Sequence, residues 1–293
     1  MSNILVIGKD GQLGQSIKAC VQTQSTDQTF MFVGRDELDL SSNDAINAFF
    51  AGKRFDVIIN CAAYTAVDKA EDDTELCQQI NSKAVAELAN IAKKQNAYFV
   101  HVSTDYVFNG KGYRPYTETD EVAPQNVYGQ TKLQGELALN AVNPSGCIIR
   151  TSWVYSEFGN NFVKTMLRLG AERDQLGIIF DQVGTPTYAG DLAQTILAMV
   201  NQYLAGNAPS QMQVYHFSNE GVCSWYDFAK AIFELANIDV EVNPIETVAY
   251  PTPAVRPHYS VLNKNKIKAQ LNCKIPYWKD SLELCLTRLK EQA

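Results

Sequence analysis

Short runs of consecutive apolar residues recur along the first half of the chain, and each is followed by glycine or polar residues. Five of them stand out, at residues 4–7, 30–33, 57–59, 98–102 and 147–149. Strands that are apolar on both faces are typical of a parallel sheet covered by helices on each side. The pattern therefore predicts five buried parallel strands.

The segments between these runs have the periodicity of amphipathic helices, as at residues 77–94 and 127–140. Alternation of strand and helix indicates a doubly wound α/β sheet of the Rossmann type. We expect this fold to occupy residues 1–155.

After about residue 155 the alternation loosens. Helices are expected in four segments, at residues 161–169, 191–203, 225–236 and 278–289, and the proline-rich stretch 251–257 is expected to be a loop. We therefore predict a smaller lobe over residues 156–293, with some of its elements returning to the main sheet.

The composition narrows the class of protein. With 46% hydrophobic and 19% charged residues among 293, the chain is neither disordered, nor a coiled coil, nor collagen-like. A formal net charge of −7 argues against a nucleic-acid or anionic-membrane partner. The first residues lack the basic and long apolar regions of a signal peptide, and no apolar run is long enough to span a membrane.

Cysteine and histidine usage points to the cytoplasm and away from a metal site. Seven cysteines are scattered without a Cys-x-x-Cys pair, which indicates reduced thiols. The three histidines lie far apart in the sequence, whereas metal ligands usually cluster.

A glycine-rich turn directly follows the first predicted strand and opens a helix. Its three glycines, Gly8, Gly11 and Gly14, permit a tight turn, a close approach to pyrophosphate and close helix–strand packing, respectively. The helix N-terminus would then face the negative charge of the ligand. The sequence thus predicts a dinucleotide site in the domain of residues 1–155, which makes residues 156–293 the substrate lobe.

The coenzyme type depends on the residues about 20 positions after Gly14. Arg35 is the first side chain after Gly34 and would accept the 2′-phosphate of NADPH. Asp36 beside it keeps NADH as an alternative. Asp39 and Leu40 then form the segment expected beside the adenine.

Tyr128 and Lys132 are four residues apart in a predicted helix, so both side chains project from one face. A nearby ammonium group lowers the pKa of a phenol and makes it a better acid–base catalyst at neutral pH. Ser103 and Thr104 end a predicted strand upstream, at the sheet edge where ligands of such folds bind. We expect Thr104 to donate a hydrogen bond to a substrate carbonyl beside Tyr128.

These features together resemble the extended short-chain dehydrogenase/reductase superfamily and, within it, the dTDP-4-dehydrorhamnose reductase family. Segments along nearly the whole chain carry the resemblance: 103–108 (STDYVF), 126–132 (NVYGQTK), 150–155 (RTSWVY), 160–162 (NNF), 181–187 (DQVGTPT), 250–253 (YPTP) and 256–257 (RP).

The resemblance implies reduction of the C4 ketone of dTDP-4-dehydro-β-L-rhamnose to dTDP-β-L-rhamnose, the last step of dTDP-L-rhamnose biosynthesis. Tyr128 would protonate the developing alkoxide, Lys132 would hold the nicotinamide ribose, and Thr104 would orient the carbonyl. Further contacts to the cofactor are expected from two segments, which contribute Asp10, Gln12 and Leu13 after the first strand and Ala62, Ala63, Tyr64 and Thr65 after the third. Asn81 would take a structural or proton-relay part, with local helix bonding as the alternative.

For the sugar, the resemblance favours Asp105 and Trp153, whose flat indole suits the apolar side of a 6-deoxyhexose. Core filling is the alternative for Trp153. Asn161 and Arg256 are weaker candidates for the nucleotide diphosphate, where a guanidinium fork suits phosphate oxygens.

One departure from the family pattern concerns Mg²⁺. Some members dimerise around Mg²⁺ held by glutamates just after the third glycine and just after the Pro-Thr motif, where this chain has Gln15-Ser16 and Gly190-Asp191. We therefore expect a metal-independent enzyme that is a monomer or a weak homodimer.

Other functions remain open at this point. A sugar-nucleotide 4,6-dehydratase needs two acidic residues after the hydroxyl residue, and here Tyr106 follows Asp105. A 4-epimerase or another reductase of the superfamily would use the same Tyr–Lys couple. A non-enzymatic regulatory subunit, like the β subunit of methionine adenosyltransferase, would not require the full set of Thr104, Tyr128 and Lys132.

Overall fold

The structure is a computed structural model that describes residues 2–23 and 27–292. Residues 1 and 293, the outer ends of the two predicted domains, lie outside the described residues, as do 24–26. Within the described part, no helix has both the length and the apolar character needed to cross a membrane.

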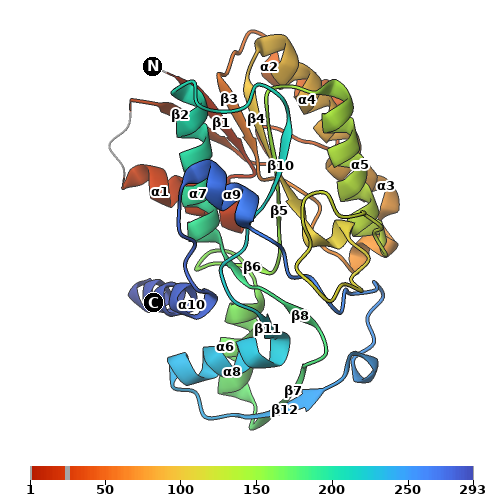
Figure 1. The fold of residues 1–293 in the computed structure, drawn as a ribbon, viewed down its shortest axis with the longest axis vertical. Coiled ribbons are helices and arrows are strands. Elements are labelled where there is room, and N and C mark those ends of the chain that lie inside the picture. The colour runs from red at the N-terminus through yellow and green to blue at the C-terminus, as the bar shows by residue number, and fades with distance from the viewer. Residues whose placement is uncertain (1, 24–26, 293) are drawn as a thin grey trace.

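A six-stranded parallel sheet forms the centre of the molecule (Figure 1). Its order is β2-β1-β3-β4-β5-β10, with bounds β1 Asn3–Ile7, β2 Thr29–Val33, β3 Val57–Asn60, β4 Tyr98–Thr104, β5 Gly146–Thr151 and β10 Gln213–His216. The doubly wound α/β fold and all five predicted strands are confirmed. The sixth strand, β10, was not predicted, and it pairs with β5 at the edge of the sheet.

Helices cover both faces of this sheet, as the apolar runs require. On one face, Ile4 and Val6 of β1 pack in a cluster with α1 (Gln12–Gln22) and α7 (Ala189–Leu204). On the other face, Leu5 and Ile7 pack with α2 (Asn43–Phe50), α4 (Ala84–Gln95) and α5 (Val127–Val142). Successive residues of one strand therefore enter two separate cores.

A second core lies below the sheet in Figure 1 and is built around three helices, α6 (Phe162–Glu172), α8 (Trp225–Ala236) and α10 (Trp278–Glu291). Three two-stranded sheets join them: β6 (Val154–Tyr155) with β9 (Thr187–Tyr188), β7 (Gln175–Ile179) with β12 (Glu241–Ile245), and β8 (Val183–Gly184) with β11 (Cys223–Ser224). The proline-rich stretch 251–257 has no helix or strand. The domain boundary at residue 155 stays a prediction. Two elements from beyond it belong to the first half: α7 packs on the main sheet and β10 is one of its strands.

Short helices complete the chain. They are η1 (Lys69–Glu71), α3 (Thr74–Gln78), η2 (Gln79–Lys83), η3 (Asp105–Val107), η4 (Thr247–Ala249) and α9 (Asn265–Leu271). η2 is a single π-helical turn that joins α3 to α4, and such turns occur often at functional sites.

A buried ion pair fixes α5 against the sheet. Glu136 of α5 accepts from Arg150 of β5 through both carboxylate oxygens, at 2.7 Å to Nη2 and 3.0 Å to Nε. The Ser103 hydroxyl of β4 donates to the same carboxylate at 2.5 Å. Three elements are thus joined at one point, close to where β4 and β5 end.

Candidate active site

The turn between β1 and α1 has the geometry of a phosphate-binding cradle. Gly8 has a φ of +93°, and a Cβ there would lie 2.8 Å from the Ala62 nitrogen. A Cβ at Gly14 would lie 2.1 Å from the Gly8 carbonyl oxygen, whereas one at Gly11 would approach that oxygen only to 3.4 Å. The packing of the protein thus requires Gly8 and Gly14. Gly11 is exposed and leaves the backbone open to an approaching anion.

Two predicted cofactor residues in this turn use their side chains elsewhere. Gln12 donates to the Val154 carbonyl at 3.3 Å and accepts from the Ser156 hydroxyl at 3.0 Å. Leu13 is buried in the core under α1. What these two residues can offer a diphosphate is therefore their backbone N–H groups in the first helical turn.

Two cations, Lys9 and Arg35, lie where the adenosine end of a dinucleotide was expected. Arg35 is 78% exposed after β2, with its Nε 4.0 Å from an Asp39 oxygen. Lys9 forms an ion pair with Glu37, which also accepts from the Gly34 nitrogen. The sequence interpretation identified Arg35 and overlooked Lys9.

Acidic side chains surround these cations. The Asp10 carboxylate lies against Gly34, since a Cβ there would be 2.2 Å from its Oδ2. Asp39 accepts from both the nitrogen and the hydroxyl of Ser41, and these hydrogen bonds lower the pKa of the Asp39 carboxyl. Leu40 is buried. Asp39 therefore stabilises its own turn, and contacts of Asp39 and Leu40 with adenine stay predictions.

Asn81 holds the segment after β3 that contains Ala62, Ala63, Tyr64 and Thr65. Its side-chain oxygen accepts from the Tyr64 nitrogen at 2.9 Å, and its amide nitrogen donates to the Tyr64 carbonyl at 3.1 Å. Asn81 is buried in the π-helical turn. Of the two roles expected for this side chain, the contacts favour the structural one.

Tyr128 lies in the first turn of α5, which is anchored at its start. Asn126 accepts from the Gly129 nitrogen at 2.8 Å as the N-cap, and Glu71 accepts from the Val127 nitrogen at 2.9 Å. The half-buried Tyr128 ring packs edge-on against Tyr106, with centroids 5.5 Å apart. The end of β4 and the start of α5 thus bring Thr104 and Tyr128 together.

The environment of Tyr128 differs from the expectation. Burial raises the pKa of the Tyr128 hydroxyl, and a hydrogen bond with Thr104 opposes this only in part. The Lys132 Nζ donates to the Val102 carbonyl at 2.7 Å and lies 3.3 Å from His101 Nε2. The expected lowering of the Tyr128 pKa is wrong for this arrangement, because burial outweighs the effects that lower it. Tyr128 is therefore protonated at neutral pH.

Asp105 is a buried carboxyl with one unpaired oxygen. Oδ1 accepts from the Thr104 hydroxyl at 3.0 Å, while Oδ2 has no partner among the described residues. Burial raises the pKa of Asp105 to about 7, against the opposing effect of the hydrogen bond from Thr104. An orphaned buried oxygen beside Thr104 suits a hydroxyl group of a ligand.

Trp153 lies at the boundary of the second core. Its backbone has a φ of +49°, and its indole stacks on Trp225 with ring centroids 3.5 Å apart. The ring is half-buried and fixed in place. Its predicted sugar contact and the alternative of core filling both remain open.

Asn161 has a different role from the one proposed for it. Its oxygen accepts from the Lys164 nitrogen as the N-cap of α6, and its amide nitrogen donates to Gln12 and to the Ser156 carbonyl. These bonds use both N–H groups of the amide and one lone pair of its oxygen. A contact of Asn161 with the diphosphate stays a prediction.

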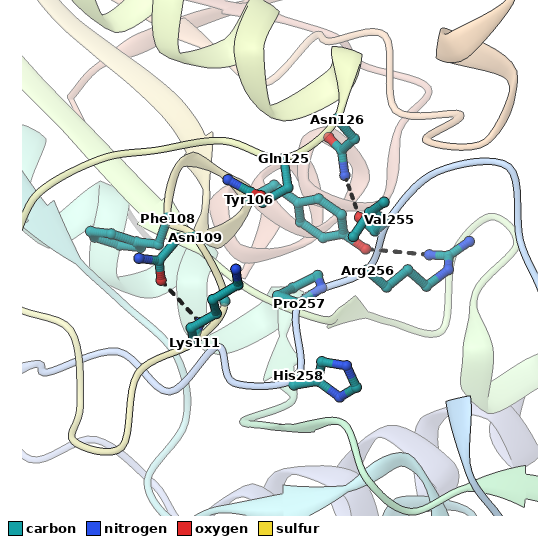
Figure 2. A pocket seen from close by; sticks show the side chains of 11 residues that line it. Tyr106, Phe108, Asn109, Lys111, Gln125, Asn126, Val255, Arg256, Pro257 and His258 are labelled. Carbon is teal, nitrogen blue, oxygen red and sulfur yellow. Dashed lines mark hydrogen bonds between the residues drawn. The ribbon is translucent and has the colours of Figure 1, made fainter. Parts of the chain in front are cut away.

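Arg256 belongs to a pocket beside Tyr106 that Figure 2 shows from close by. Its Nη2 lies 2.6 Å from Asp68 Oδ2, and its Nη1 donates to the Tyr106 hydroxyl at 3.3 Å. Asn126 donates to the neighbouring Val255 carbonyl at 2.8 Å. The guanidinium is thus held beside Tyr106 and already paired with a carboxylate, and its contact with a diphosphate stays a prediction.

Several residues of this region were missed by sequence reasoning. Asp68, Tyr106 and Ser260 contact predicted site residues from separate segments, and no local pattern indicated them. His101 left a signal, because a histidine within an apolar strand must find a buried partner.

Comparison with known proteins shows the family of this chain. The family model described as the RmlD substrate binding domain matches residues 1–291. A dTDP-4-dehydrorhamnose reductase of Escherichia coli (strain K12) is 41% identical over 294 residues, which cover 98% of each chain.

The chain belongs to the dTDP-4-dehydrorhamnose reductase family.

Solved structures support this family assignment. A dTDP-4-dehydrorhamnose reductase of Clostridium acetobutylicum matches with a TM-score of 0.90 and 42% identity, over 98% of this chain and 99% of that one. A Bacillus anthracis member of the family, solved in complex with NADP, matches with a TM-score of 0.89 and 35% identity, over 98% and 99%. The family resemblance predicted from the sequence is confirmed.

Gly14 and Gly11 differ in the space available for a Cβ, so substituting each by alanine tests the packing and the binding role of the cradle separately. We expect Gly14→Ala to lower the free energy of unfolding by more than about 2 kcal/mol, because its Cβ meets a backbone carbonyl. Gly11→Ala should lower the free energy of unfolding by less than about 1 kcal/mol. It should still weaken NADPH binding at least about tenfold, because the added Cβ hinders the approach of the diphosphate. Chemical denaturation and fluorescence titration measure the two effects, and wild-type affinity in Gly11→Ala would contradict the cradle.

Asp105 predicts a pH dependence of stability. The folded-state pKa of Asp105 is raised from 3.8 to about 7. The contribution of this carboxyl to the free energy of unfolding is therefore fully present below pH 4 and is lost as the pH rises through 7. Asparagine does not ionise, so Asp105→Asn avoids this loss. At pH 8 we expect the free energy of unfolding of the variant to exceed that of wild type by at least about 1 kcal/mol, which raises the melting temperature by about 2–4 °C. Near pH 4 the two proteins should melt alike. A variant that melts at or below the wild-type temperature at pH 8 would refute the assignment.

Proposed function

We propose that the protein reduces the C4 ketone of dTDP-4-dehydro-β-L-rhamnose to dTDP-β-L-rhamnose with NADPH. The observation that carries the proposal is the approach of Tyr128 to Thr104 at the sheet edge that also presents the glycine cradle, with Lys132 one turn further along α5. The names of the relatives supply the substrate class, since each is a dTDP-4-dehydrorhamnose reductase.

The cradle and the two cations after β1 and β2 suit a phosphorylated dinucleotide. The open backbone at Gly11 would receive the diphosphate, while Arg35 and Lys9 would face a 2′-phosphate. The exposed Asp36 keeps NADH as the second coenzyme. When bound, the reduced nicotinamide supplies a hydride to the sugar carbonyl carbon.

The chain's own residues supply the proton and the orientation. The Thr104 hydroxyl would turn its one proton from Asp105 Oδ1 to the carbonyl oxygen and fix that oxygen beside Tyr128. The Tyr128 hydroxyl, which is protonated at neutral pH, would then give its proton to the developing alkoxide. Lys132 would donate to the nicotinamide ribose and stabilise the phenolate left on Tyr128.

The sugar would be held by residues around this point. The unpaired oxygen of Asp105 would accept a hydrogen bond from a sugar hydroxyl. The fixed indole of Trp153 would pack against the apolar side of the 6-deoxyhexose. Arg256 would reach the nucleotide diphosphate only by exchanging or sharing its pairing with Asp68.

The test follows oxidation of NADPH, and then of NADH, after adding dTDP-4-dehydro-L-rhamnose made in situ. We expect wild type to consume NADPH faster than NADH and Tyr128→Phe to lose about 100- to 10,000-fold in kcat. Retained dinucleotide binding in the variant would show that it is folded. Bound dinucleotide without consumption by wild type would reject the reductase and direct the search to epimerase activity or a protein partner.

We further propose that the reaction needs no metal and that the protein is a monomer or a weak homodimer. The donors near the family's Mg²⁺ position do not fit that ion: Gln15 donates its amide to the Asp10 carbonyl, and Asp191 Oδ2 accepts from Asn219 and Ser281. The part of the chain that the structure describes holds no group of three or more histidine, cysteine or acidic residues suited to a metal.

EDTA should therefore leave the rate of NADPH oxidation unchanged. The reason is that Gln15 and Asp191, near the family's Mg²⁺ position, already have hydrogen-bond partners within the protein. The control is the same assay with added Mg²⁺. Activity that disappears with EDTA and returns with Mg²⁺ would overturn this part of the proposal.

A further inference from the structure

A row of buried polar groups lies behind the catalytic lysine, and the proposed mechanism does not use it. Asn60 ends β3, and His101 lies beside it in the register of β4. Asn60 and His101 are 0% exposed, and Lys132 is 1% exposed. The row runs from Asn60 through His101 to Lys132, so each contact takes place without competing water.

The direction of the hydrogen bonds in this row follows from its first member. Asn60 Oδ1 accepts from the Ala62 nitrogen at 3.1 Å, which turns its amide nitrogen toward His101 Nδ1 at 3.2 Å. Nδ1 must therefore accept. Burial lowers the pKa of His101 well below its ordinary value, so the ring is neutral and carries its single proton on Nε2.

The Nε2 proton of His101 is aimed at Lys132, whose Nζ lies 3.3 Å away. An amine at Nζ can accept this proton as a hydrogen bond, whereas an ammonium would meet it donor to donor. The Val102 carbonyl, at 2.7 Å, accepts from Nζ in either form. The row therefore favours the amine form of the lysine.

Other titratable groups near Lys132 act on the same balance. Burial lowers the pKa of Lys132 to about 8, and Glu136, Cys77 and Cys61 oppose this shift. Glu136 is already paired with Arg150. Burial raises the pKa of both cysteine thiols, which keeps them neutral. None of these groups reaches Nζ by a hydrogen bond in the structure, which leaves His101 as the side chain in direct contact.

We propose that His101 is a positioning residue for Lys132, which holds Nζ against the Val102 carbonyl and sets the balance between its ammonium and amine forms. The inference deepens the proposed function, because Lys132 must be an ammonium to hold the dinucleotide ribose and to stabilise the phenolate of Tyr128. His101 would then determine the pH above which the lysine stops doing so.

Two variants separate this role from a merely structural one. In His101→Gln the amide reaches the position of Nε2, and its oxygen can accept from the ammonium. The protonated form is then favoured, and we expect the alkaline limb of kcat/KM to move to higher pH by about one unit, a tenfold gain in relative rate on that limb. In His101→Asn the amide ends near the position of Nδ1 and does not reach Nζ. We expect a smaller shift and a higher KM for NADPH.

The control is His216→Gln. His216 is also 0% exposed and, like His101, has its pKa lowered by burial, but its ring contacts the Tyr116 carbonyl and Arg150, away from Lys132. This variant should keep the wild-type pH profile. Superimposable profiles of wild type and His101→Gln, or an equal shift in His216→Gln, would overturn the proposal.

Two further measurements do not depend on turnover. The pH dependence of NADPH binding, followed by fluorescence, should shift in the same order as the rate profiles. If it does so in a protein that fails to reduce the sugar, the proposed function is rejected and the role of His101 is retained.

The second measurement uses wild type, so that a variant that fails to fold leaves the proposal testable. NMR of protein carrying ¹³Cε-labelled lysine, with Lys132 assigned from Lys132→Arg, should show Lys132 titrating near 8. Titration of Lys132 near the ordinary lysine value of 10.5 would overturn the inference.

Discussion

The buried ion pair between Glu136 and Arg150 determines where helix α5 lies against the sheet. Taking two charges out of water is costly, and the cost is offset only when the geometry is good and the remaining oxygens are bonded. Here both carboxylate oxygens meet the guanidinium and Ser103 adds a third bond. Because the partners lie on α5, β5 and β4, the pairing is satisfied in one placement of the helix. That placement brings Tyr128 beside Thr104.

The second half of the chain then completes the site from the other side. The segment around Arg256 is tied to the nucleotide-binding half at Asp68 and Tyr106, more than 140 residues away along the sequence. Ser260, from the same part of the chain, lies close enough to Asp105 to oppose the rise of its pKa. The proposed sugar site thus lies between two halves that are held together by polar contacts.

Much of the fold could be predicted from the sequence, because a strand buried on both faces leaves a continuous apolar run. β10 left no such signal: Gln213–His216 mixes polar and apolar residues and lies at the sheet edge. The glycine cradle and the pairing of Tyr128 with Thr104 were also accessible, since each depends on local spacing at strand ends. The side-chain roles of Gln12 and Asn161 were not, because they bond to each other across 149 positions. The direction of Lys132 depends likewise on a histidine of a neighbouring strand.

Asn126 illustrates how such contacts limit the choice of residue at one position. Its oxygen caps α5 at Gly129, and its nitrogen donates to Val255 in the proline-rich segment. Aspartate would supply the acceptor and lose the donor, while serine is too short for one atom to serve both partners. Two unrelated requirements, the start of a helix and the attachment of a distant loop, therefore fall on one planar amide. Asparagine meets both because its two ends carry opposite hydrogen-bonding character.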